Sequence, residues 1–292
     1  RPTDPRTRID QAALAGFPVV LTRSQARKLC KKGLITLNGE KVDSSRFVHP
    51  GDRLQLLPQE QSNHPVYPLE VSIIYEDDAM AMVIKPPGLP VNGNRHRTLE
   101  HALPHNLKPS GADDALACPR PVHRIDHRTG GLVVIAKRQL ALLGLTNAFM
   151  HRRVEKRYFA LVAGKILTPF TVNSSIDGRD AVTHFQPERC IPSLHIGDFT
   201  QIWAQPVTGR THQIRIHLAE SGHPILGDDL HVGPDALPVL RRHGLFLWAQ
   251  KLSFNHPVTD QRLTAEAPVP PKYERFCERE LRRWKRFHSS DP

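Results

Sequence analysis

HRIDHRTGGLVVIAK, residues 123–137, contains a single carboxylate, that of Asp126, among histidines and arginines. An apolar run follows it and predicts a buried strand over 130–137. Gly130 and Gly131 permit backbone angles that other residues avoid, so we expect a sharp loop that holds the acid at the mouth of the strand. The neighbouring cations favour the ionised carboxylate, which suits a nucleophile, a base or an ion-pair partner better than a proton donor. A purely structural salt bridge is the alternative interpretation.

The patterns on both sides of this stretch predict short strands and helices that alternate from residue 68 onward. Residues 104–121 are rich in Pro, Gly and Asp, which predicts a loop. We predict a domain of the α+β class over 68–287, with a mixed, mostly antiparallel sheet flanked by helices. Its strands are expected within 73–91, 130–137, 154–165, 199–209 and 245–257, and its helices within 139–153, 210–222 and 274–287.

Residues 8–57 predict a smaller domain, followed by a polar linker over 58–67. Helices are expected at 8–16 and 22–33, and the Asn-Gly pair within 34–42 predicts a hairpin turn. The second helix has a basic face with few compensating acids nearby. A solvated helix surface usually alternates the sign of its charges, so this face indicates RNA binding more than simple solvation. Its cations are Arg23, Arg27, Lys28, Lys31 and Lys32.

The composition of the 292 residues is that of a globular protein with a formal net charge of +11. Such an excess favours a polyanionic partner, either nucleic acid or an anionic membrane. No apolar run approaches the length of a membrane span, and residues 1–8 lack the apolar region of a secretory signal. The four cysteines are far apart in sequence, which indicates a reducing compartment. We therefore expect a cytoplasmic or organellar matrix protein that is not secreted and does not contact a membrane.

Two further stretches carry candidate functional residues. EKRY places Tyr158 after a basic pair at the start of a strand, where a core tyrosine is the alternative. TGRTHQ places Arg210 in a turn that opens a helix, where backbone N–H groups and the guanidinium make a positive pocket for an anion. A metal hydrolase is a weaker hypothesis, prompted by 17 histidines, because His212 and His217 are five residues apart and not the four that a helical zinc site prefers.

These stretches, taken in order, resemble the RluA-type RNA pseudouridine synthases. HRID with TGGLVVIAK, EKRY and TGRTHQIRIHLAESGHPILGD carry the resemblance, and VIKPPGLPV and LFLWAQKLSFNHP extend it from about Ile73 to about Pro268. TRSQARKLCKKGLITLNGEKV and PGDRLQL resemble the alpha-L RNA-binding domain, which holds structured RNA through its cationic helix. An alpha-L domain before such a catalytic domain is a familiar arrangement in this family.

The resemblance implies a role for each candidate residue. Asp126 takes the place of the essential aspartate, Tyr158 that of the tyrosine that stacks on the target base, and Arg210 that of the arginine that pairs with the aspartate. Leu247 takes the place of the apolar residue lining the uracil pocket. Arg124 lies where the family can insert a side chain into the space left by the flipped base. Asp126 attacks or assists at either the anomeric carbon or the uracil ring, and no cofactor or metal is implied.

The sequence departs from the family pattern beside Asp126. His127 replaces the usual acid, and Gly130 replaces a serine. These departures affect the expected loop geometry and substrate choice more than the expected activity, because the three proposed catalytic positions are intact. The resemblance implies isomerisation of specific uridines in structured RNA, with large-subunit ribosomal RNA the commonest association of this domain pairing. A non-catalytic RNA-binding ribosome-assembly factor that retains the synthase fold is the alternative. Oligomeric state is left open by the sequence.

Overall fold

The computed structural model describes residues 7–17, 19–20, 22–57, 66–232 and 243–288. The chain divides into two compact units, Arg1–His64 and Pro65–Pro292. Most of the expected linker, residues 58–65, lies outside the described residues. Tyr67, at the end of that expected linker, packs against an apolar cluster of the larger unit, and its N–H donates to the carbonyl of His101.

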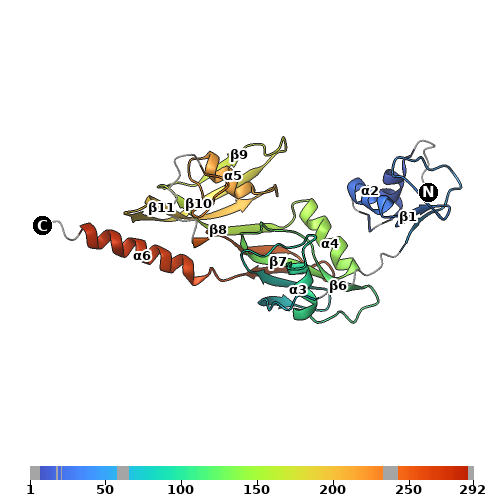
Figure 1. The fold of residues 1–292 in the computed structure, drawn as a ribbon, viewed down its shortest axis with the longest axis horizontal. Coiled ribbons are helices and arrows are strands. Elements are labelled where there is room, and N and C mark those ends of the chain that lie inside the picture. The colour runs from blue at the N-terminus through green and yellow to red at the C-terminus, as the bar shows by residue number, and fades with distance from the viewer. Residues whose placement is uncertain (1–6, 18, 21, 58–65, 233–242, 289–292) are drawn as a thin grey trace. The chain divides into compact units, whose positions relative to one another are not determined.

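The smaller unit combines two helices with a small sheet (Figure 1). Thr22 caps the second helix, since its hydroxyl accepts a hydrogen bond from the N–H of Gln25 at 3.1 Å. Asn38 and Gly39 adopt positive φ angles of 55° and 86° in the hairpin, as the Asn-Gly pair predicts. The elements are α1 (Ile9–Gly16), α2 (Arg23–Lys31), β1 (Ile35–Leu37), β2 (Glu40–Lys41) and β3 (Leu54–Leu56), with sheet order β2-β1-β3.

The larger unit contains one extended sheet. Among the described strands its order is β4-β5-β7-β12-β8-β11-β10-β9, while β13 pairs with β12 and β6 with β7. Every described pairing is antiparallel except that of β7 with β12. The strands are β4 (Ile73–Glu76), β5 (Met80–Lys85), β6 (Ala115–Pro121), β7 (Gly130–Arg138), β8 (Glu155–Ala163), β9 (Phe170–Asn173), β10 (Val182–Ser193), β11 (Gly197–Pro206), β12 (Leu247–Asn255) and β13 (Arg262–Glu266).

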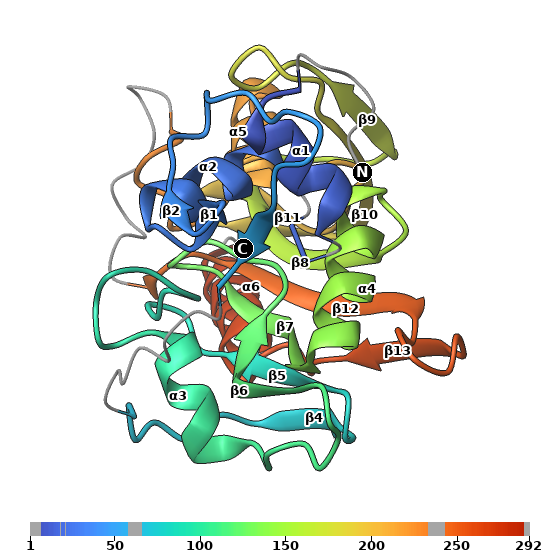
Figure 2. The same ribbon diagram turned by 90° about the vertical axis from the view of Figure 1, so that its right-hand side faces the viewer.

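Helices cover both faces of this sheet (Figures 1 and 2). Alternate residues of β7 enter two apolar clusters, as a strand buried on both faces requires. Helix α3 contributes Leu99 and Leu103 to one cluster, and the other three helices contribute to the second. The helices are α3 (Leu99–Asn106), α4 (Gln139–Met150), α5 (Gln213–Glu220) and α6 (Pro271–His288). The predicted α+β class with a mixed, mostly antiparallel sheet is confirmed, and none of the described helices is long and apolar enough to cross a bilayer.

The prediction of a loop over 104–121 is wrong in part. Helix α3 continues to Asn106, and residues Ala115–Pro121 form β6. That strand contains two prolines and pairs with β7 alone, with an irregular register between Ala115 and Arg120. Strand β10 also escaped prediction, because Pro187 and Pro192 interrupt its strand pattern. Proline is tolerated at sheet edges and bulges, and β10 has a register shift beside Pro187.

Candidate active site

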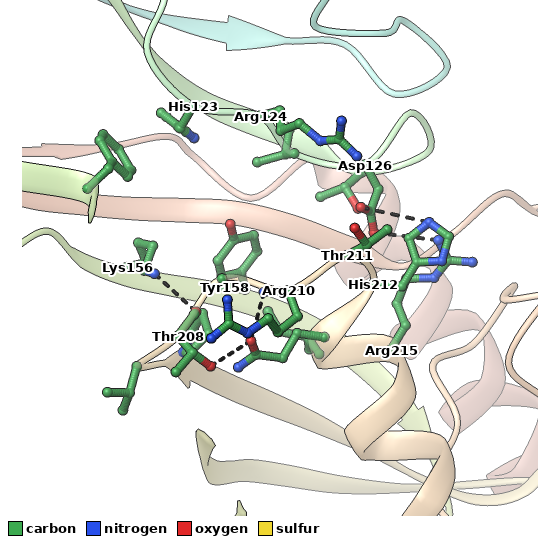
Figure 3. A pocket seen from close by; sticks show the side chains of 18 of the residues that line it. His123, Arg124, Asp126, Lys156, Tyr158, Thr208, Arg210, Thr211, His212 and Arg215 are labelled. Carbon is green, nitrogen blue, oxygen red and sulfur yellow. Dashed lines mark hydrogen bonds and ion pairs between the residues drawn. The ribbon is translucent and has the colours of Figure 1, made fainter. Parts of the chain in front are cut away.

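One cavity of about 560 Å³ gathers the residues that the sequence singled out in the larger unit. Asp126, Tyr158 and Arg210 all line it, although they come from a loop, a strand and a turn far apart in the chain (Figure 3). Arg124 and Leu247 line it as well. The fold therefore brings together all five residues that the resemblance assigned to the site.

The loop that carries Asp126 is shaped by the two glycines that follow it. Gly131 has φ of +118°, and a Cβ atom there would lie 2.2 Å from the carbonyl oxygen of Ala249 on β12. At Gly130, a Cβ atom would meet the Trp248 ring at 2.4 Å. A serine at position 130 would therefore clash with the tryptophan ring. The parallel pairing of β7 with β12 begins at Gly130, so Asp126 lies in the loop that leads into this pair.

A buried lysine and a histidine anchor the same loop. The ammonium group of Lys85 is fully buried and donates to three carbonyls, those of Pro86, Leu89 and His127, at 2.9, 2.7 and 3.3 Å. Burial lowers the pKa of Lys85 to about 7, and the charge of Asp126 opposes this shift. His123 accepts a hydrogen bond from the N–H of Val134 at 3.0 Å, and burial lowers its pKa to about 3, so it is the neutral acceptor that this bond needs.

Asp126 pairs with Arg215, and the expectation that it pairs with Arg210 is wrong (Figure 3). Nη1 of Arg215 lies 3.5 Å from Oδ2 of Asp126. The same guanidinium makes a bidentate pair with Asp228, with both N···O distances at 2.7 Å. The side chain of Arg215 is 2% exposed and that of Asp228 is 0% exposed. This buried pair fixes the guanidinium on α5, which then presents its remaining edge to Asp126.

Arg210 lies in the cavity wall in a different arrangement. Its Nε donates to the carbonyl of Asp180 at 3.1 Å. Gln213, which is buried, accepts hydrogen bonds from the N–H of Arg210 and the hydroxyl of Thr208. The amide of Gln213 also donates to the carbonyl of Val182, which ties the turn to β10. The turn is thus held rigidly, and the guanidinium of Arg210 has no carboxylate partner among the described residues.

Tyr158 lies in the centre of the sheet, where β8 pairs with β12 and β11. Its backbone faces Ala249 on one side and Ala204 on the other. Burial, and then the charge of Asp126, raise the pKa of the Tyr158 hydroxyl well above its usual 10. The phenol therefore keeps its proton at neutral pH and can donate it to a partner in the cavity.

The histidines of the larger unit do not converge on a metal site. His212 contacts His231 at 2.9 Å, and its Nε2 lies 3.9 Å from Asp126, whereas His217 contacts the hydroxyl of Thr183. His223 contacts the carbonyl of Ala163. Within the described ranges, no group of three or more His, Cys, Asp or Glu side chains is placed to hold a metal ion.

In the smaller unit, α2 and its C-cap residue Lys32 carry the predicted cations, but two of them have an acidic partner. Arg23 and Arg27 pair with Asp10 of α1 at 3.0 and 2.9 Å, and the carboxylate is 2% exposed. One compensating acid therefore lies beside this face, because the packing of α1 against α2 buries Asp10 next to these two arginines. No ion pair involves Lys28, Lys31 or Lys32 among the residues placed in the structure.

Comparison with known proteins assigns the chain to a class of RNA-modifying enzymes. Residues 79–220 match the RNA pseudouridylate synthase model, and residues 18–54 match the S4 domain model. The chain belongs to the RNA pseudouridylate synthase family and has an S4 domain at its N-terminal side, which confirms both resemblances.

Relatives and solved structures agree with this assignment. The chain is 33% identical to an uncharacterized RNA pseudouridine synthase of Bacillus subtilis, YlyB, over 85% of this chain and 86% of that one. It is 32% identical to ribosomal large subunit pseudouridine synthase C of Vibrio vulnificus, over 88% and 87% of the two chains. The fold is similar to that of human RNA pseudouridylate synthase domain containing 1, with a TM-score of 0.57 and 24% identity over 70% of this chain and 86% of that one.

Proposed function

We propose that this protein isomerises specific uridines to pseudouridine in large-subunit ribosomal RNA. The observation that carries the proposal is the meeting of Asp126, Tyr158 and Arg215 in one cavity whose other charged lining residues are cations. The S4 domain supplies a second RNA-binding surface, and relatives named as ribosomal large subunit pseudouridine synthases support the choice of RNA.

In this proposal Asp126 is the reacting carboxylate. Its ion pair with Arg215 holds it at the cavity wall. It acts at the anomeric carbon while the bond from that carbon to N1 of uracil breaks. The freed base turns within the cavity, and a bond from C5 to the same carbon forms. C5 then loses its proton and N1 gains one, so the reaction consumes no other reactant.

Tyr158 and Leu247 form the base-binding part of the site. The Tyr158 ring provides a face on which uracil stacks, and its retained proton allows it to donate to the base during proton transfer. Leu247 is 3% exposed at the start of β12 and supplies an apolar wall. Arg124 is exposed at the cavity mouth, where it can enter the space that the flipped base leaves in the RNA. Arg210 binds the nucleotide and does not orient Asp126, because its Nε bonds to the carbonyl of Asp180 while Arg215 pairs with that carboxylate.

The test is release of tritium from RNA labelled at C5 of uridine, with ribosomal RNA from cells that lack the protein. Wild-type protein is expected to release tritium, and Asp126→Asn to release none while binding the RNA as tightly as wild type. Asp113→Asn is a matched control, because it makes the same change at an exposed carboxylate outside the cavity. Equal release by Asp126→Asn and wild type would remove Asp126 from the reaction. RNA binding with no release by the wild-type protein would favour the assembly-factor alternative.

A further inference from the structure

Two cations that have no role in the proposed reaction lie on a wall shared by two cavities. Lys156 and Arg152 line the active-site cavity and also line a second cavity of about 390 Å³. Pro206 and Val207 belong to both linings as well, so the two cavities are neighbours along one surface. The second lining adds Arg157 and Lys251, which both pair with Glu266, and one acid, Glu155.

Lys156 points to the same side of the sheet as the tyrosine on which the base is proposed to stack. Residues two apart on a strand face the same side, and the strand rise puts Lys156 and Tyr158 about 7 Å apart. Both side chains line the active-site cavity (Figure 3). The ammonium group of Lys156 donates one hydrogen bond, to the carbonyl of Thr208 at 3.2 Å, and has further donor capacity.

Neither cation has an acidic partner among the residues that the structure describes. Glu155 is adjacent in sequence and lines the second cavity, but its carboxylate pairs with Arg262 at 2.6 Å. Asp126 is the single carboxylate in the lining of the first cavity, and it pairs with Arg215. Burial, and then the charge of Arg152, lower the pKa of Lys156 to about 8. Lys156 is half-buried and Arg152 is exposed beside it. Two neighbouring cations repel each other, and an anion bound between them would relieve that repulsion.

We propose that Lys156 and Arg152 bind the phosphate group of the RNA backbone that adjoins the target uridine. This rests on the proposed function, because the position of the phosphate follows from a base stacked on Tyr158. The second cavity then receives the neighbouring nucleotide, with Arg157 and Lys251 along its wall. A contact of this kind fixes the register of the RNA without reading its sequence.

The probe is uridine 3′,5′-bisphosphate, compared with uridine, in titration calorimetry on the full chain. Wild type is expected to bind the bisphosphate more tightly than uridine. Lys156→Met and Arg152→Gln should each weaken bisphosphate binding by about tenfold or more, because each removes a charge-assisted hydrogen bond. Lys156→Arg should restore most of the affinity. Arg153→Gln is the matched control, since Arg153 is an exposed neighbour that bonds to Asn147 and lines neither cavity.

Equal affinity of wild type and Lys156→Met for the bisphosphate would overturn the proposal, provided that their thermal unfolding coincides. If Lys156→Met unfolds, Arg152→Gln decides the question in the same way. Binding of poly(U) then tests whether the two cations contact the backbone of an RNA chain or only a free mononucleotide. The slope of log K against log salt should fall by about 0.7 for each lost contact, and an unchanged slope would overturn the assignment to the backbone. These binding measurements need no turnover. A failure of tritium release would therefore contradict the proposed reaction and leave the result of the binding measurements unchanged.

Discussion

The two carboxylates that share Arg215 are expected to respond differently to the same substitution. Asp228 is fully buried, with both of its oxygens on the guanidinium at 2.7 Å, and it also accepts from the N–H groups of Leu230 and His231. Asp126 has a side chain that is 21% exposed and lies 3.5 Å from the same group. The first pair is therefore a structural element, and the second leaves the carboxylate accessible to a substrate.

Asp228→Asn should destabilise the larger unit by about 3 kcal/mol, because breaking a buried ion pair leaves one charge uncompensated. Asp126→Asn should change the free energy of unfolding by about 1 kcal/mol or less, because a partly exposed pair is screened by water. Urea unfolding followed by tryptophan fluorescence measures the difference. All three tryptophans, Trp203, Trp248 and Trp284, belong to the larger unit, so the signal reports on that unit alone.

Activity should be affected in the opposite order, with the larger loss in Asp126→Asn. Asp126→Asn should abolish tritium release, whereas Asp228→Asn should retain measurable release under conditions where it is folded. Similar losses of unfolding free energy in the two variants would show that the different burial of Asp228 and Asp126 does not decide their contribution to stability.

The stability difference should also depend on pH with a definite sign. Burial would raise the pKa of Asp228, but hydrogen bonds and charge from Arg215 outweigh it and lower the pKa below 3.8. A carboxyl with a lowered folded-state pKa stabilises the protein above its unfolded pKa, and that stability is lost as the pH falls through the folded pKa. The gap between wild type and Asp228→Asn should therefore be complete at neutral pH and narrow below about pH 4. A gap that widens in acid would contradict this assignment.

Three further outcomes are expected. Gly131→Ala should destabilise the protein by about 3 kcal/mol in urea unfolding, because the new Cβ would meet the Ala249 carbonyl and the backbone has a positive φ; a stable variant would mean that β7 and β12 can separate at little cost. Affinity for uridine 3′,5′-bisphosphate should fall as the pH rises through about 8, because Lys156 loses its proton there; Lys156→Arg should remove this dependence, and a wild-type affinity that calorimetry finds unchanged between pH 7 and pH 9 would contradict it. Neutralising the cations of α2 that have no acidic partner should reduce the slope of log K against log salt for ribosomal RNA by about one unit per contact; an unchanged slope would show that the helix does not touch RNA. These cations are Lys28 and Lys31, together with the C-cap residue Lys32.

Much of the fold was predictable because local patterns and local energetics agree. The run over 130–137 is a buried strand, the Asn-Gly pair is a hairpin turn and Thr22 caps its helix, each for a reason contained within a few residues. The loop and strand assignments failed where prolines occur in strands, as in β6 and β10. Pairing with a neighbouring strand overrides local preference there, and the partner strand is far away in sequence.

The sequence by itself determined the chemistry that the site contains: an acid among cations, a tyrosine on a strand and an arginine in a turn before a helix, in an order typical of one family. Only the tertiary structure decided which groups meet. Arg210 and Arg215 are five residues apart, and no local signal says which one faces Asp126. Burial of Asp228 fixes Arg215, and Gln213 turns the Arg210 segment toward β10. Side-chain pairing across 89 residues depends on how α5 packs against the sheet, and that packing is a property of the whole fold.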